Sequence, residues 1–422
     1  MMRDMTWADG FDEQAREILR RNDRGGYTIP TSGLYPYQWN WDSAFAALGF
    51  AQFDLDRAWC EIETLFTGQW TNGMVPHILF HAPDEGYFPS HEVWQGTGPI
   101  PSSGISQPPV AATMARLIYE RDPEIGAARM EMLFDKMVAW HRWFMAWRLD
   151  RGAVCVTHPW EAGRDNAPDW DVAMAAITPD GVGEYKRRDT SHVDSSMRPT
   201  KYDYDRYIWL VQRGARLGWD EAAMLDGTPF RVADPTMTFT LLRAMRDLAV
   251  MGAALGRDTG EIEGWIKVLE AGAATLWNDD LGCYDSRDVR SGTWAGAVSN
   301  ASFLCWYAGI DRPEMRDLYR DVLAQVKYGV PSLPPSDDRF DGKRYWRGPV
   351  WGVMNLMIAL GLADMGLTDE AEALRASTAD LVAQQGFAEY FDPRDGGPAG
   401  GSSFTWTAAI WLGWASPNAQ GV

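Results

Sequence analysis

Apolar residues recur along this chain at helical spacing, three or four positions apart, in one segment after another. Between residues 311 and 327 they stand at Met315, Leu318, Tyr319, Val322, Leu323 and Val326. This spacing puts these side chains on one face of an α-helix. Over residues 130–147 a similar stripe includes His141, which we interpret as a core histidine because its neighbours on the stripe are apolar.

Repetition of this pattern predicts a chain of helices, whereas the alternating pattern of a half-buried strand is scarce. The expected helices are 11–22, 42–52, 54–68, 107–121, 130–147, 203–217, 234–255, 259–277, 296–308, 311–327, 347–365, 368–384 and 404–414. No fixed-period sequence repeat is visible, which disfavours a regular solenoid. Helices in successive pairs are typical of αα-hairpins that close into a ring. We therefore expect an all-α fold, a toroid of paired helices, as a single domain over residues 1–422.

Two long segments, about 70–106 and 157–202, interrupt the helical pattern. Both are rich in Gly, Pro and aromatic residues and have no amphipathic period. Long loops in compact domains are usually functional or disordered, and the Trp, His and Tyr content argues against disorder. We expect both segments to cover one face of the ring as the cap and walls of a pocket.

Charge and cysteine usage exclude several classes of protein. A net charge of −19 disfavours attraction to nucleic acid or to an anionic membrane. No apolar stretch is long enough to span a membrane, and the polar N-terminus lacks an apolar signal region. The cysteines, Cys60, Cys155, Cys283 and Cys305, show the spacing of neither a disulfide framework nor a zinc site. We expect a cytoplasmic protein that binds neither nucleic acid nor membrane; the sequence leaves homo-oligomer formation open.

One histidine pair has metal-ligand spacing. His77 and His81 are four positions apart, but Pro76 and Pro83 make the segment a loop rather than a ligand helix. We therefore predict no metal site.

Two acidic motifs lie far apart in the chain, HPWEAGRDN at residues 158–166 and GFAEYFDP at residues 386–393. Each places carboxylates among aromatic rings and Gly or Pro turns. A carboxyl group in such surroundings tends to have a perturbed pKa. Two of them can divide the work of acid and base, as in the hydrolysis of a glycosidic bond.

Aromatic and polar residues precede three of the predicted helices. In YPYQWNWD, residues 35–42, Asp42 either caps the following helix or accepts hydrogen bonds from sugar hydroxyls beside stacking Trp rings. Gln107 has the same two interpretations. In RYWRGPVW, residues 344–351, Trp351 is either core packing or part of a pocket. The glycine-rich stretch 396–401 lacks the ending of a P-loop, and we interpret it as a mobile turn near Glu389.

These motifs, in this order, resemble those of glycoside hydrolase family 63 and its trehalase-like relatives. Within the family the chain is similar to the bacterial glucosylglycerate and mannosylglycerate hydrolases, over about residues 30–414. The resemblance implies an (α/α)6 barrel and an inverting mechanism that uses no metal or organic cofactor. It also implies that Asp165 is the general acid and Glu389 the general base.

Substrate-binding residues are likewise implied by the resemblance. Asp42 would hold the sugar in the −1 site. The residues that would line this site are Tyr35, Trp39, Trp41, Gln107, Trp346 and Trp351. The residues that would grip the glycerate are Tyr87, Arg198, Tyr204 and Tyr345. An alternative for Arg198 is a loop ion pair with Asp194 or Asp203.

The expected activity is hydrolysis of a small α-glucoside, with glucosylglycerate as first choice. One departure from the family pattern bears on this choice: Gly401-Ser402-Ser403 precede Phe404 where glycerate-cleaving members carry a glutamine. The alternatives are mannosylglycerate, a neutral disaccharide cleaved as by an α-glucosidase or trehalase, or sugar binding without catalysis. A mere binder has no need of two carboxylates, which argues against the last alternative.

Overall fold

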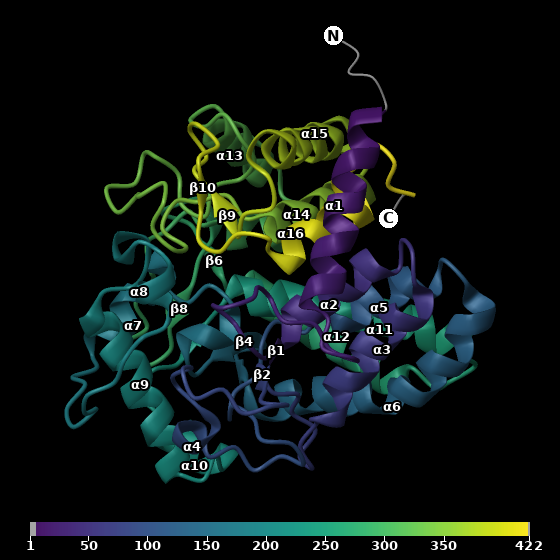
Figure 1. The fold of residues 1–422 in the computed structure, drawn as a ribbon. Coiled ribbons are helices and arrows are strands. Elements are labelled where there is room, and N and C mark those ends of the chain that lie inside the picture. Colours follow the sequence, from purple (N-terminus) through teal and green to yellow (C-terminus); the bar gives the residue numbers. More distant parts are fainter. Residues whose placement is uncertain (1–5, 421–422) are drawn as a thin grey trace.

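The computed structural model describes residues 6–420 and consists mainly of helices (Figure 1). Within this range six elements form a closed inner ring, each packed on the next and the last on the first. In ring order they are α2 (Asn40–Phe50), α5 (Ala111–Tyr119), α11 (Pro235–Ala254), the 3₁₀ helix η4 (Asn300–Cys305), α14 (Gly352–Asp364) and α16 (Thr405–Ile410). A π-helical turn, η5 (Trp411–Ala415), continues α16.

An outer helix follows or precedes each inner element. In chain order the outer helices are α1 (Thr6–Asn22), α3 (Leu55–Thr67), α6 (Pro123–Trp147), α12 (Gly260–Ala274), α13 (Pro313–Leu323) and α15 (Thr368–Gln385). In Figure 1 the purple α1 runs beside the yellow α16, so the two ends of the described chain meet and close the ring. Inner and outer helices alternate from α1 to α16. The fold is the expected (α/α)6 barrel.

The fifth inner element corrects one predicted helix. We expected an α-helix over 296–308, but this segment holds only the short 3₁₀ helix η4. Its serines make hydrogen bonds outside the helix: Ser299 Oγ donates to Asp169 at 3.0 Å, and Ser302 Oγ donates to the Tyr284 carbonyl. Such side chains compete with the helical backbone pattern.

Two outer helices begin earlier than predicted. Helix α6 begins at Pro123, where Asp122 accepts a capping hydrogen bond from the Ile125 N–H at 3.1 Å. An Asp cap followed by Pro at the first helical position is a standard start signal, so the sequence did contain this boundary. Helix α1 begins at Thr6.

Two of the inner helices, α2 and α14, are buried on nearly all sides. Every residue of α2 is buried, and α14 is buried over almost its whole length and is apolar on all faces. A helix that is apolar all round belongs in the core, here between the outer helices and the middle of the barrel. His141 is fully buried on α6, as predicted.

The remaining elements lie mostly in the connections, and all except α9 are short. The helices are α4 (His91–Trp94), η1 (Pro159–Ala162), η2 (Pro168–Trp170), α7 (Asp171–Ala175), α8 (Asp189–His192), η3 (Ser195–Met197), α9 (Lys201–Arg216) and α10 (Glu221–Gly227). The strands are β1 (Gln38–Trp39), β2 (Ile78–Leu79), β3 (Leu149–Asp150), β4 (Ala153–Val156), β5 (Val232–Ala233), β6 (Trp277–Asn278), β7 (Cys283–Tyr284), β8 (Arg287–Asp288), β9 (Tyr390–Phe391) and β10 (Pro398–Ala399). They pair antiparallel as β1-β2, β3-β4-β5-β8, β6-β7 and β9-β10.

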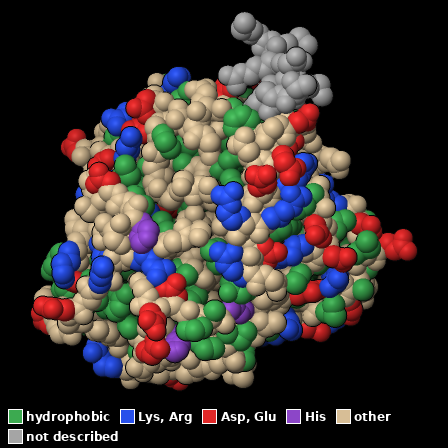
Figure 2. Space-filling view, in the orientation of Figure 1, with side chains coloured by type: hydrophobic (Ala, Val, Ile, Leu, Met, Phe, Trp, Pro, Cys, Tyr) green, Lys and Arg blue, Asp and Glu red, His purple; other side chains and the backbone are tan. Residues whose placement is uncertain are grey.

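Acidic and basic side chains are interspersed over the face in Figure 2. On this face, acidic side chains therefore lie among Arg and Lys side chains. Over residues 6–420, no helix combines the length and apolarity needed to cross a bilayer.

Candidate active site

A cavity of about 110 Å³ opens at the loop-covered face of the barrel. It is lined by Pro30, Leu34, Tyr35, Trp39, Trp41, Asp42, His77, Ile78, Tyr87, Phe88, Gln107, Trp160, Gly163, Asp165, Arg188, Asp189, Arg198, Pro199, Tyr204, Tyr345, Glu389, Phe404 and Trp406. Both long irregular segments contribute to this wall, 70–106 through residues such as Tyr87 and 157–202 through residues such as Asp165. Eleven of the thirteen residues predicted for the site share this one cavity.

The two exceptions are Trp346 and Trp351, which we expected in the −1 site. Both are fully buried, and their rings stack on each other with centroids 3.8 Å apart. Trp346 lies behind Trp41 at 6.1 Å, and Trp351 lies behind Tyr345 at 5.1 Å. The stacked pair supports the rings that face the cavity.

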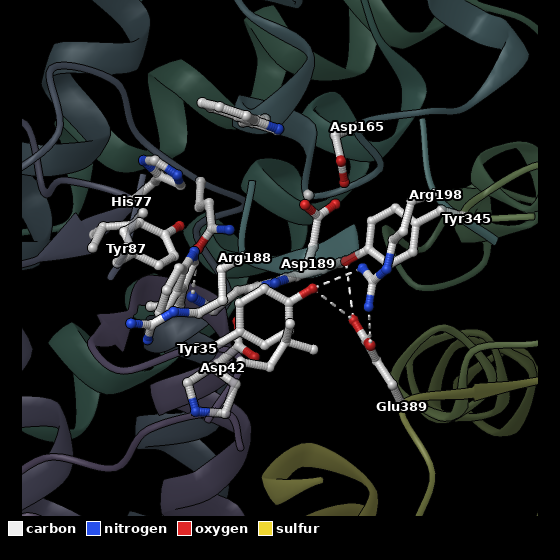
Figure 3. A pocket seen from close by; sticks show the side chains of 18 of the residues that line it. Tyr35, Asp42, His77, Tyr87, Asp165, Arg188, Asp189, Arg198, Tyr345 and Glu389 are labelled. Carbon is white, nitrogen blue, oxygen red and sulfur yellow. Dashed lines mark hydrogen bonds and ion pairs between the residues drawn. The ribbon is translucent and has the colours of Figure 1, made fainter. Parts of the chain in front are cut away.

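Asp165 stands just after the 3₁₀ helix η1, at a sharp turn through Gly163. Gly163 has φ +68°, and a Cβ there would lie 2.6 Å from the Trp41 ring, so only glycine fits. Within residues 6–420, no side chain of another residue donates a hydrogen bond to the Asp165 carboxylate, and Figure 3 draws it with no dashed line. Burial raises the pKa of Asp165 to about 7, with a further upward contribution from Glu389. The carboxyl group is therefore mainly protonated below about pH 7.

The neighbouring Arg164 anchors this turn. Its guanidinium is fully buried and forms ion pairs with Asp169 at 2.9 Å and Asp234 at 3.1 Å. Asp234 also caps α11 by accepting from the Met237 N–H. The backbone that carries Asp165 is thereby fixed to an inner helix of the barrel.

Glu161, the other carboxylate of the same motif, has a different environment. It is buried outside the cavity, accepts from the Thr157 N–H at 2.6 Å, and pairs with Arg148 at 3.3 Å. A carboxylate held this way is structural, so the structure distinguishes the two acidic residues of the motif.

Glu389 precedes strand β9 and faces the cavity from the opposite side to Asp165 (Figure 3). Its Oε1 accepts from the hydroxyls of Tyr35 at 3.2 Å and Tyr345 at 3.1 Å. Its Oε2 accepts from Arg198 Nη2 at 3.0 Å and from the Gly401 N–H at 2.8 Å. This carboxylate is held by four donors, one of which is a guanidinium.

Asp42 lies in the first turn of α2, which begins at Asn40. Trp39 is the N-cap residue and no side chain caps the helix, so the capping interpretation of Asp42 is wrong. Burial first, and the charge of Glu389 second, hold the pKa of Asp42 well above its ordinary value. A buried carboxyl group in the cavity wall is suited to hydrogen bonds with sugar hydroxyls.

Gln107 does not cap the helix that follows it, since α5 begins only at Ala111. Its Oε1 accepts from the backbone N–H of Trp41 at 3.2 Å. This contact orients the side-chain amide in the cavity wall and ties it to α2.

Arg198 forms neither of the loop ion pairs that were the alternative. Asp194 instead accepts from the Ser196 N–H at 2.9 Å, and Asp203 lies 3.6 Å from Arg206. Arg198 is buried, binds Glu389, and donates from Nη1 to the Tyr35 hydroxyl at 2.8 Å.

Tyr87 and Tyr204 line the cavity from two different segments. Tyr204 stands on α9 and its hydroxyl donates to the Phe88 carbonyl at 3.3 Å. Tyr87 packs edge-on against Trp39 at 5.7 Å. Together they place hydroxyl groups and ring faces near the cavity mouth.

Sequence reasoning missed several lining residues, of which Arg188 and Asp189 are charged. Arg188 pairs with Asp84 of the other irregular segment, and Asp189 pairs with Arg187 at 2.5 Å. The charged run at 186–189 was the available signal, but an irregular loop gives no periodicity that would tell which charges face inward.

The histidine pair is accounted for by hydrogen bonds. His77 lines the cavity and contacts Ser103 Oγ at 2.7 Å, and His81 contacts Gln38 at 2.7 Å. Among the described residues no cluster of His, Cys, Asp and Glu has the arrangement of a metal site.

Comparison with known proteins identifies a family that this chain matches. Residues 35–407 match the model of the mannosylglycerate hydrolase MGH1-like glycoside hydrolase domain. The chain belongs to this family. It is a glycoside hydrolase, as the resemblance to glycoside hydrolase family 63 implied.

Three relatives illustrate the likeness. A mannosylglycerate hydrolase, MGH1, of Selaginella moellendorffii is 43% identical, over 95% of this chain and 85% of its own. A glucosylglycerate hydrolase of Mycolicibacterium hassiacum is 32% identical, over 95% and 96%. The crystal structure of the family 63 mannosylglycerate hydrolase of Thermus thermophilus, in complex with Tris and D-glycerate, superposes with a TM-score of 0.91 at 41% identity, covering 95% of this chain and 98% of that one.

Proposed function

We propose that this enzyme hydrolyses an α-hexoside of glycerate with inversion at the anomeric carbon. Asp165 donates its proton to the glycosidic oxygen as the bond to C1 breaks. Glu389 takes a proton from the water that attacks C1 from the opposite face. Both proton transfers are made by side chains, so this mechanism uses no metal or organic cofactor.

The observation that most supports these roles is the contrast between the two carboxyl groups across one cavity. The pKa of Asp165 is about 7, which suits a proton donor, while Glu389 is paired with Arg198, which suits a proton acceptor. Asp42 and Gln107 would bind the hydroxyls of the hexose. Trp39 and Trp41 supply ring faces for the apolar side of the sugar.

For the sugar, we rank mannosylglycerate ahead of glucosylglycerate, which was the first choice from the sequence. The support is the higher identity to enzymes named mannosylglycerate hydrolases, 43% and 41% against 32% for the one named glucosylglycerate hydrolase. Glycerate as the aglycone is supported by Arg198, a buried cation at the cavity wall of a chain with net charge −19. The Tyr345 ring lies 4.5 Å from the Arg198 guanidinium, and Tyr87 and Tyr204 line the same cavity.

The direct test is a chromatographic screen of the purified protein with mannosylglycerate, glucosylglycerate, trehalose and kojibiose. We expect release of hexose and glycerate from the first two, faster from mannosylglycerate. Cleavage of only the neutral disaccharides would replace this proposal by a trehalase-like or α-glucosidase activity. We keep a cytoplasmic location within the proposal, consistent with four free cysteine thiols among the described residues.

A further inference from the structure

The Glu389 carboxylate has no acceptor position left for water. A carboxylate offers about four lone-pair sites on its two oxygens. Tyr35 and Tyr345 occupy Oε1, and Arg198 and the Gly401 N–H occupy Oε2. The Glu389 side chain is 0% exposed. A general base must accept a hydrogen bond from the water that it activates, so one of these donors has to leave before catalysis.

Three of the donors are fixed by their surroundings. The Gly401 N–H is held by the backbone, because the Glu389 N–H donates to the Gly401 carbonyl at 2.8 Å. Tyr35 packs edge-on against Trp39 at 5.3 Å and against Phe404 at 6.0 Å. Tyr345 packs in the same way on Trp351.

Arg198 is the donor that can leave. It lies in the short link between η3 and α9, and its Nε is a buried donor without a hydrogen-bond partner among the described residues. Nη2 donates to Glu389, as the dashed line in Figure 3 shows. Nε and Nη2 form one edge of the guanidinium, which can bind a carboxylate with two parallel hydrogen bonds. An anion on this edge would satisfy Nε and bind the second N–H of Nη2, and its charge would compete with the charge of Glu389 for the guanidinium.

We infer that Arg198 exchanges carboxylates during the reaction, from Glu389 in the empty enzyme to the carboxylate of the aglycone in the complex. This inference rests on the proposed function, because it requires an anionic aglycone such as glycerate. The exchange frees a lone pair on Oε2, where the hydrolytic water then binds. Water loses a proton to Glu389 as its oxygen bonds to C1, and the aglycone oxygen leaves with the proton of Asp165.

An anionic aglycone then acts as an activator as well as a ligand. A substrate without a carboxylate leaves Arg198 on Glu389 and should be hydrolysed slowly even at saturation, so its deficit appears in kcat rather than in KM alone. An ordinary binding arginine would change mainly the KM of the anionic substrate.

The test separates aglycone from sugar by using α-mannosyl fluoride, whose leaving group contains no carboxylate. With saturating fluoride substrate, added D-glycerate should raise kcat of the wild-type enzyme about tenfold or more, up to the roughly 10²–10⁴-fold that general-base assistance can contribute. Glycerol, which lacks the carboxylate, should not activate. Inhibition by glycerate, or no effect on kcat, would overturn the exchange.

Two variants sharpen the result. Arg198→Ala removes the guanidinium that exchanges, so glycerate should no longer activate fluoride hydrolysis in this variant. Activation by glycerate that persists in Arg198→Ala would also overturn the inference. The matched control is Arg394→Ala, since Arg394 pairs with Asp392 at 2.8 Å near Glu389 but is 57% exposed and lies outside the cavity. It should leave activation by glycerate intact.

Failure of the inference is distinguishable from failure of the proposed function. If mannosylglycerate is cleaved but glycerate never activates fluoride hydrolysis, the exchange is wrong and the function stands. If no glycerate hexoside is cleaved and glycerate does not activate, both are wrong.

Discussion

The turn that carries Asp165 and the hairpin that carries Glu389 face each other across one cavity. They give their carboxyl groups opposite environments. Among the described residues no neighbouring side chain donates to Asp165, and burial raises its pKa to about 7. Glu389 receives four hydrogen bonds, one of them from a guanidinium. Desolvation without a partner favours the protonated form, and charge-assisted hydrogen bonds favour the ionised form. These different surroundings support the proposed roles of Asp165 as the acid and Glu389 as the base.

The largest expected effect comes from removing either carboxyl group. Asp165→Asn and Glu389→Gln should each lower kcat on mannosylglycerate by about 10³-fold or more, since each proton transfer contributes roughly 10²–10⁴-fold. α-Mannosyl fluoride distinguishes the two, because fluoride leaves without a proton donor. Asp165→Asn should retain most of its fluoride hydrolysis and Glu389→Gln should lose it. The reverse pattern would exchange the two roles.

The pH dependence tests the Asp165 side of the comparison. Its raised pKa means that the acid form is present below about pH 7 and is lost as pH rises through that value. We expect kcat/KM for mannosylglycerate to fall about tenfold per unit above pH 7, or about 100-fold by pH 9. With α-mannosyl fluoride this decrease of kcat/KM above pH 7 should be absent. An identical decrease for both substrates would assign it to a group other than Asp165.

Adding a single methyl group at Gly400 tests whether the position of the Glu389 carboxylate matters for catalysis. Gly400 has φ +73°, and a Cβ there would lie 2.3 Å from Glu389 Oε2. Gly400→Ala should displace the carboxylate and lower kcat about 100-fold, as misplacement by about 1 Å can. Gly396→Ala is the matched control, because Gly396 also has positive φ, +81°, but its Cβ would meet Tyr328 and Leu381 instead. Equal losses in the two variants would attribute the effect to backbone strain.

The smallest effect concerns stability. The folded pKa of Asp165, about 7, exceeds its ordinary value of 3.8, so the folded state binds the proton more tightly than the unfolded state. The free energy of unfolding therefore falls as pH rises from 3.8 to about 7. Between about pH 5 and pH 8 this loss is roughly 2–3 kcal/mol, and Asp165→Asn should abolish it. Urea unfolding of both proteins at the two pH values measures the difference; equal pH dependence in both would contradict the raised pKa.

The barrel was predictable because its helices repeat one simple pattern. Apolar spacing located nearly all inner and outer helices, and it failed at η4, where Ser299 and Ser302 bond to other segments. The failure has a physical cause: hydrophobic periodicity records which residues are buried, but not whether polar side chains compete with the helical backbone.

The sequence motifs predicted which segments form the site, but not which of their side chains lie behind the cavity wall. Carboxylates among aromatic and glycine residues pointed to the two motifs, and the resemblance to glycoside hydrolase family 63 singled out Asp165 and Glu389, which share the cavity. The same motifs could not show that Trp346 and Trp351 stack behind the wall, because a buried ring and a sugar-stacking ring have the same sequence signature. Nor could they show that Arg198 binds Glu389, a contact between residues 191 positions apart.

The stereochemistry of the first turnover tests the central claim most directly. Proton NMR of mannosylglycerate freshly mixed with the enzyme distinguishes the two anomers of released mannose before mutarotation mixes them. An acid at Asp165 and a water-activating base at Glu389 predict that β-mannose appears first. Initial release of α-mannose would mean retention through a covalent intermediate, and would contradict the assignment of Glu389 as a base that acts on water.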